Sequence, residues 1–176
     1  MPLFNPPLPT PQALYDGELA TTGSAVGAAT TVYLVASREL LVPATLTNVR
    51  CGFATVGGTG HYDVGIYDAT GANGAPNNLL AHAASTITAL ATATGNQTPA
   101  LIGGNINLIP GRYWLALWID NATDTIFRPG ASAAGRAVAM SGTNAGPLPA
   151  LASSITGLAD GSFKPWIVGL LSGGWS

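Results

Sequence analysis

The stretch HYDVGIYD at His61–Asp68 predicts a β-strand, because its side chains alternate between the two faces of a sheet. Tyr62, Val64 and Ile66 fall on one face. The opposite face carries His61, Asp63 and Tyr67. The first of these faces is suited to the core of an all-β domain, and the neighbouring segments can be interpreted around it.

The stretch PGRYWLALWID at Pro110–Asp120 alternates in the same way and predicts a second strand. One of its faces carries four large side chains, Tyr113, Leu115, Leu117 and Ile119. The opposite face carries Trp114 and Trp118, so both faces need an apolar cover. We expect another copy of the chain to cover the tryptophans, since aromatic residues are enriched in the buried cores of interfaces. The alternative is that the tryptophans are exposed and stack on the sugar rings of a glycan.

Short β-patterns separated by turn residues fill most of the remaining chain. Strands are expected at 30–36, 45–53, 61–68, 79–94, 105–109, 113–120, 125–128 and 163–171, with shorter candidates at 40–42, 136–141 and 153–158. The segment 79–94 is read as one or two strands, although its alanines also favour a helix. The predicted fold is therefore all-β: a single antiparallel β-sandwich or jelly roll of about eight or nine strands, spanning residues 30–176.

Within the expected strand 45–53, alternation predicts that Thr47, Val49, Cys51 and Phe53 point into the core. Cys51 is the only cysteine of the chain, which excludes an internal disulfide and a cysteine-based zinc site within one copy. We expect it to be a small buried residue.

The composition indicates an assembly component. Hydrophobic residues make up 47% of the 176 residues, and only 8% are charged, against about 25% in typical domains. A surface so poor in charge is expected to be covered by copies of the chain or by a larger assembly. The six basic residues are scattered over a chain of net charge −2, which argues against nucleic-acid binding. Every apolar run ends well before 18 residues, so no membrane insertion is expected, and the first residues lack the pattern of a signal peptide.

Residues 1–12 carry five prolines and favour extended polyproline-like geometry. We interpret residues 1–29 as an N-terminal arm and its connector. Two alternatives remain open for the arm: a disordered tail, or a segment that lies along a neighbouring subunit and buries Leu3, Phe4 and Leu8 there.

The polar residues do not form a recognisable site. The two histidines, His61 and His82, are not accompanied by a Gly-x-Ser-x-Gly motif, and most acidic residues occupy turn positions. Two loops carry oxygen donors that could hold calcium, Asp68 with Thr70 and Asn73, and Asp120 with Asn121 and Asp124, but both lack the acidic density of an EF-hand. We therefore expect no catalytic residue, no cofactor and no metal.

Four segments together resemble the small β-sandwich structural proteins of tailed bacteriophages. They are YDVGIYDATG at 62–71, LLA at 79–81, IPGRYWLAL at 109–117 and FKPWIVG at 163–169, in a resemblance that covers about half of the chain. The resemblance carries no functional residue over. The face of Trp114 and Trp118, together with Trp166, remains a candidate interface.

The resemblance implies a non-enzymatic virion protein, made in the host cytoplasm and placed on the particle surface. It also implies a homo-oligomer, most simply a trimer. A capsid decoration protein attached to the major capsid protein through its N-terminal arm is the expected role. A tail-fibre or baseplate module that binds a host-surface glycan is the alternative. The absence of a heptad segment for a long fibre shaft favours decoration.

Overall fold

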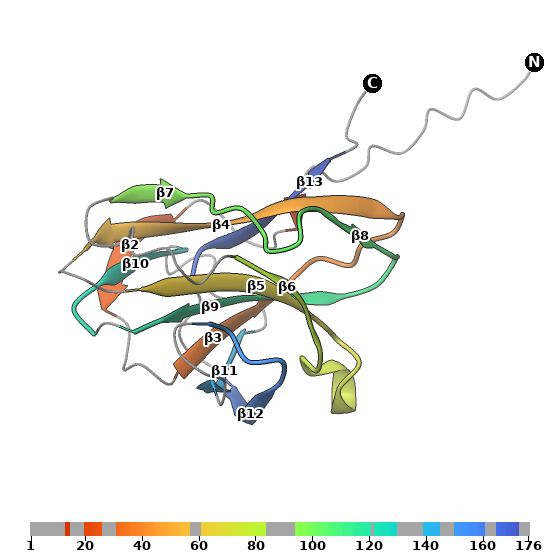
Figure 1. The fold of residues 1–176 in the computed structure, drawn as a ribbon. Helices are drawn as coiled ribbons and strands as arrows, with labels where there is room; N and C mark the ends of the chain where they lie inside the picture. Colours follow the sequence, from red (N-terminus) through yellow and green to blue (C-terminus); the bar gives the residue numbers. More distant parts are fainter. Residues whose placement is uncertain are drawn as a thin grey trace, which may run out of the picture.

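The computed structural model describes residues 13–14, 20–25, 31–56, 61–83, 94–120, 122–129, 139–144, 150–160 and 165–172. Over these residues the chain forms two antiparallel β-sheets packed face to face, which confirms the predicted all-β sandwich (Figure 1). The described part contains thirteen strands and one short 3-10 turn at Ala72–Gly74. It has no helix long and apolar enough to cross a membrane.

The first sheet is built around the long strand β4 (Ala44–Thr55). The strand order is β1 (Ala13–Leu14), β13 (Ile167–Ser172), β4, β10 (Thr125–Pro129) and β2 (Ala20–Ala25), while the short strands β7 (Gly95–Gln97) and β8 (Ile106–Leu108) also pair with β4.

The second sheet is built around β9 (Tyr113–Ile119) and β5 (Tyr62–Asp68). Its strand order is β12 (Ile155–Asp160), β11 (Ala139–Asn144), β3 (Thr31–Ala36), β9, β5 and β6 (Leu79–His82). The two stretches from which the fold was predicted are direct neighbours, paired in register from Tyr62–Ile119 to Asp68–Tyr113.

The main core lies between the two sheets. The second sheet contributes the faces predicted for β5 and β9, including Val64, Ile66 and Leu117, all fully buried. Phe53 from the first sheet meets Tyr62 edge-on, with ring centroids 5.3 Å apart. Cys51 is also fully buried here, as predicted, and burial raises the pKa of its thiol well above the ordinary value.

One inward residue of β4 was predicted wrongly. Between Leu170 and Leu171 of β13 the pairing with β4 shifts, so that Asn48 faces Leu170 but Leu46 faces Leu171. The extra residue is Thr47, whose hydroxyl donates a hydrogen bond to the Leu170 carbonyl. This β-bulge puts Leu46 into the core in place of Thr47, which simple alternation could not foresee.

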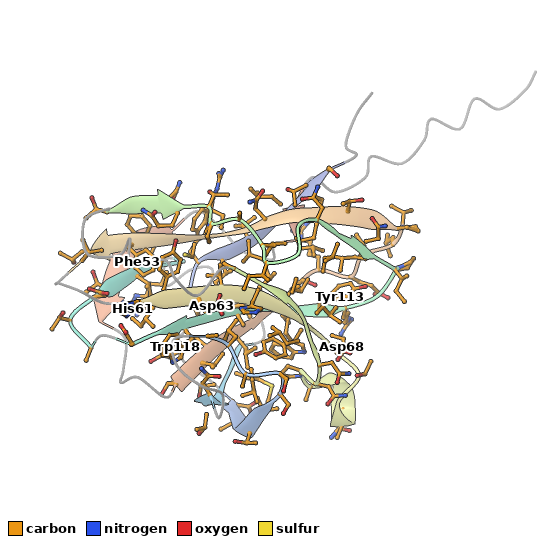
Figure 2. The ribbon with its side chains drawn as sticks, in the orientation of Figure 1. Phe53, His61, Asp63, Asp68, Tyr113 and Trp118 are labelled. Atoms are coloured by element: carbon orange, nitrogen blue, oxygen red, sulfur yellow. The ribbon has the colours of Figure 1, made fainter. Side chains whose placement is uncertain are left out.

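The outer face of the second sheet carries a second core. It contains Val32, Leu34, Tyr67, Trp114, Ala116 and Trp118 from the sheet, with Leu151 and Ile155 packed over them. We call residues 150–154 the covering segment. Figure 2 shows Trp118 on the opposite side of β5 and β9 from Phe53.

This second core corrects the expectation that another copy covers the tryptophans. Trp114 and Trp118 are 6% and 0% exposed in the single chain, and Trp166, next to β13, is 8% exposed. The cover of Trp114 and Trp118 is intramolecular, because Leu151 of the covering segment and Ile155 of β12 pack on the same face of the sheet. None of the three offers the exposed aromatic face that an interface or a sugar ring would need.

Three expected boundaries also change. Ala13–Leu14 and Ala20–Ala25 belong to the first sheet, so part of the predicted connector is integral to the sandwich. The expected strand at 40–42 is reduced to a single bridge between Leu40 and Gly111. In the segment 79–94, only Leu79–His82 forms a strand within the described residues. Leu3, Phe4 and Leu8 lie outside the described residues.

Candidate functional site

A pocket of about 430 Å³ opens at one end of the sandwich. Its walls come from the end of β3 at Ala36, the loop after β5 (residues 68–70, 73 and 74) and the turn into β9 (residues 109–114). Figure 2 shows Asp68 and Tyr113 at this end, with Phe53 and His61 at the other. The volume falls within the range of about 300–1,000 Å³ that is usual for ligand pockets.

The loop wall is held by Asp68. Its Oδ1 accepts hydrogen bonds from the Thr70 hydroxyl at 2.8 Å and from the backbone N–H of Asn78 at 3.0 Å. Its Oδ2 accepts one from the side-chain Nδ2 of Asn78 at 2.8 Å. Desolvation acts to raise the pKa of Asp68, but the hydrogen bonds from Asn78 and Thr70 outweigh it and hold the pKa below its usual range. Asp68 therefore anchors the loop.

The aromatic residues of the pocket are fixed by hydrogen bonds to its walls. Trp114 Nε1 donates to the Gly74 carbonyl at 2.8 Å, and the Tyr113 hydroxyl donates to the Ile109 carbonyl at 2.6 Å. Asn73 has a φ of 57° and Gly74 a φ of 77°, so the loop turns through left-handed conformations to present that carbonyl. These two bonds tie both walls to β9 and form the pocket before any ligand is present.

Exposed apolar side chains lie at the pocket: Ile109 and Pro110 line it, and Leu41 lies beside it, next to Leu40, which pairs with Gly111 of the lining. Leu41 is 71% exposed and Ile109 is 73% exposed, the highest values among the large apolar residues that the structure describes as exposed. They flank the bridge at which Leu40 and Gly111 exchange backbone hydrogen bonds, and Pro110 lies beside them, also exposed. We call Leu41, Ile109 and Pro110 the apolar lip.

Arg112 is exposed and lines the same pocket. It makes no ion pair with a carboxylate of the described residues. A guanidinium carries five N–H donors in a planar fork and accepts none, so Arg112 is available to donate to carbonyl or carboxylate oxygens of a ligand.

Two histidine–aspartate pairs lie outside the pocket. His82 Nδ1 is 2.7 Å from Asp63 Oδ2, and His61 Nδ1 is 2.6 Å from Asp120 Oδ2. Asp120 also accepts a hydrogen bond from the His61 backbone at 2.6 Å, which closes the end of β5 onto β9. The described residues contain no group of three histidine, cysteine or acidic side chains arranged to hold a metal.

Asp63 fastens the covering segment to the sheet. Its Oδ2 accepts a hydrogen bond from the Leu151 amide at 2.8 Å as well as contacting His82, and the carboxyl is fully buried. Desolvation raises the pKa of Asp63, although the Leu151 hydrogen bond and the charge of His82 oppose it. Both histidine–aspartate pairs thus have a structural function in holding strands and loops together.

Of the predicted interface residues that the structure describes, only Trp114 lines the pocket, and there it is almost fully buried. The apolar lip and Arg112 were not singled out from the sequence. The signal that could have found them is the position of Ile109 and Arg112 on either side of the Pro110–Gly111 turn, since turns between paired strands lie at the ends of a sandwich.

Comparison with protein-family models, with curated proteins and with solved structures finds no match for this chain.

Proposed function

We propose that this chain is a non-enzymatic structural subunit of a bacteriophage particle surface, most specifically a capsid decoration protein attached through its N-terminal arm. The observation that carries the proposal is the apolar lip on a chain of which only 8% of the residues are charged. Exposed apolar side chains grouped at one site mark surfaces that another protein covers.

The resemblance of the β5 and β9 stretches to phage β-sandwich proteins supports the same role. On that basis the partners are other copies of the chain, in a trimer, and the major capsid protein. The second sheet already buries both of its faces within one chain, so we assign these contacts to the end that carries the pocket and the exposed apolar lip.

The proposal is tested on the purified full chain with the double variant Leu41→Asp/Ile109→Asp. We expect wild type to be an oligomer by native mass spectrometry and to co-sediment with phage particles that lack it. The double variant should be monomeric and should stay in the supernatant, because two carboxylates cannot be buried unpaired in an interface.

The matched control is Ile102→Asp, which places the same charge on another exposed apolar residue, 50% exposed and outside the pocket. It should behave as wild type. A wild-type chain that is monomeric at micromolar concentration and does not bind particles would contradict the proposal.

The second candidate function is a tail-fibre or baseplate module that binds a host-surface glycan. Thr70, Asn73 and Arg112 favour it, because they place polar groups around a pocket with apolar walls, as sugar sites require. A glycan array tests it: binding that is lost in Arg112→Ala supports this candidate, and an array without binding removes it.

A further inference from the structure

We propose that the pocket and its apolar lip form the receptor for residues 1–12 of a second copy of this chain. The inference rests on the oligomer of the proposed function and departs from it at one point, because residues 1–12 would then join copies of the chain instead of binding the major capsid protein. Three observations carry it: the direction in which the chain enters β1, the chemistry of residues 1–12, and the free donors of the pocket.

The first observation is the direction of β1. Ala13 pairs with Leu170 and Leu14 with Gly169, and these residues of β13 pair in turn with Asn48 and Val49 of β4. Because β1 is antiparallel to β13 and β13 is antiparallel to β4, β1 runs in the same direction as β4. The chain therefore enters β1 from the end at which β4 begins.

That end carries the pocket. β4 begins at Ala44, which pairs with Leu108, and the apolar lip lies immediately beyond both residues. Twelve residues in polyproline geometry can span about 37 Å at about 3.1 Å per residue. In that geometry residues 1–12 are long enough to reach a neighbouring copy whose pocket lies within this distance of Ala13.

The second observation is the sequence MPLFNPPLPTPQ itself, which has five prolines, the large apolar residues Met1, Leu3, Phe4 and Leu8, and no charged side chain. Proline-rich segments of this kind bind to grooves lined by aromatic and apolar residues, because little conformational entropy is lost on binding. The pocket offers exposed apolar walls in Ile109 and Pro110, and the nearly buried rings of Tyr113 and Trp114 also line it. An uncharged segment also suits a pocket whose one carboxylate, that of Asp68, is already engaged by Thr70 and Asn78.

The third observation concerns hydrogen bonds. A polyproline segment makes none internally, so its carbonyl oxygens need donors from the protein that binds it. Arg112 supplies such donors at the edge of the pocket, where it is exposed and pairs with no carboxylate of the described residues. Apolar anchoring by Phe4 and the leucines would then be combined with hydrogen bonds from Arg112 to the backbone.

The test is a disulfide cross-link in the full chain carrying Phe4→Cys and Ile109→Cys. Ile109 is suitable because it lines the pocket, is 73% exposed and makes no side-chain hydrogen bond. The native Cys51 is fully buried, so it does not compete. Under a mild oxidant we expect a covalent dimer or higher species on a non-reducing gel, lost on reduction.

The matched control is Phe4→Cys with Ala122→Cys. Ala122 is exposed in the turn between β9 and β10, at the opposite end of the sandwich from Tyr113. We expect at least a tenfold lower yield of cross-linked product there. A synthetic peptide of residues 1–12 in excess should suppress the Ile109 product, and the same peptide with Phe4, Leu3 and Leu8 replaced by serine should not.

If the main product were a monomer with an internal disulfide, residues 1–12 would bind the pocket of their own copy. That result would overturn docking between copies. A yield no higher than that of the Ala122 control would overturn docking in the pocket altogether. Particle binding of the unmodified chain is measured in parallel. Binding without the cross-link overturns this inference alone, whereas the cross-link without binding overturns the virion role alone.

Discussion

Two aspartates near the two ends of strand β5 hold two regions that differ in their exposure. Asp63 is fully buried and fastens the covering segment over the second core, while Asp68 is partly exposed and fastens the loop that forms one wall of the pocket. In the first region the chain covers its own aromatic face completely. In the second it leaves Leu41 and Ile109 exposed beside a pocket.

The two regions differ in the desolvation free energy of the carboxylate and in the segment that this carboxylate fastens. A buried carboxylate is expensive to desolvate and stabilises a fold only when its hydrogen bonds compensate. Asp63 meets that condition only in part: its Oδ2 accepts from Leu151 and pairs with His82, whereas its Oδ1 is buried without a hydrogen-bond partner among the described residues and desolvation raises the pKa of the carboxyl. Asp68 keeps much of its hydration and can hold a loop at little cost. The covered face is thus a permanent part of the fold, and the open end is suited to contacts formed later.

The largest expected effect comes from replacing a tryptophan of the covered face. Trp118→Ala should lower the free energy of unfolding by about 3–5 kcal/mol, the same range as Phe53→Ala in the main core, because both side chains are fully buried. Urea denaturation followed by circular dichroism measures both. Trp118→Ala with unchanged stability but weakened self-association would mean that this face is an interface between copies after all.

A smaller effect is expected from removing the carboxylate that holds the covering segment. Asp63→Ala leaves the buried Leu151 amide without its acceptor, which costs about 1–3 kcal/mol. Asp63→Asn keeps an acceptor oxygen and removes the buried charge, so its loss should be smaller. Denaturation gives the two energies, and amide hydrogen exchange at Leu151 should accelerate in the alanine variant alone. Equal exchange in both variants would show that the hydrogen bond does not hold the segment.

Close packing at Gly65 also indicates that the covering segment is part of the fold. Gly65 lies directly beneath the covering segment, where an added Cβ would come within 2.8 Å of Leu151 Cδ1 and 2.7 Å of the Ala81 carbonyl oxygen. Contacts that short require a shift of the backbone or of Leu151. The absence of a side chain at this position is therefore what lets the segment lie close to β5.

Alternation predicted β5, β9 and the main core correctly, because each strand packs one face against the opposite sheet. It failed at Thr47, where a bulge changes the phase of β4. It also could not show what covers Trp118. A sequence pattern specifies that a face is apolar, but whether the cover comes from the same chain depends on contacts between distant residues, such as Asp63 with Leu151. The covering segment itself has no periodicity, so only its three-dimensional position reveals its function.

The pocket could be predicted only in part, for a related reason. The Asp68 turn and the Pro110–Gly111 turn are both readable in the sequence, but their meeting at one end of the sandwich depends on the pairing of β5 with β9. The apolar lip depends in addition on the Leu40–Gly111 bridge. Residue types alone do not distinguish Ile109 on the surface from Ile119 in the core.

The smallest expected effect is at the open end, and it depends on pH. Hydrogen bonds lower the pKa of Asp68 in the folded chain from the ordinary value of 3.8. The stabilisation that Asp68 contributes is therefore fully present above pH 3.8. It is lost as the pH falls through the lowered pKa of the folded chain. Asp68→Asn should cost up to about 1 kcal/mol at neutral pH, because solvent weakens an exposed interaction, and this difference from wild type should close in acid.

The contribution of Asp63 to stability should change with pH in the opposite direction. Comparing the two aspartates therefore tests whether the two regions differ electrostatically. Because its pKa is raised in the folded chain, the carboxyl of Asp63 contributes more stability below the ordinary value of 3.8 and loses that contribution as the pH rises through the raised pKa. Urea denaturation of wild type, Asp63→Asn and Asp68→Asn across acid and neutral pH separates the two. If Asp68→Asn differed from wild type by the same energy at every pH, the loop would be held by packing rather than by the carboxylate, and the contrast between the two regions would lose its electrostatic basis.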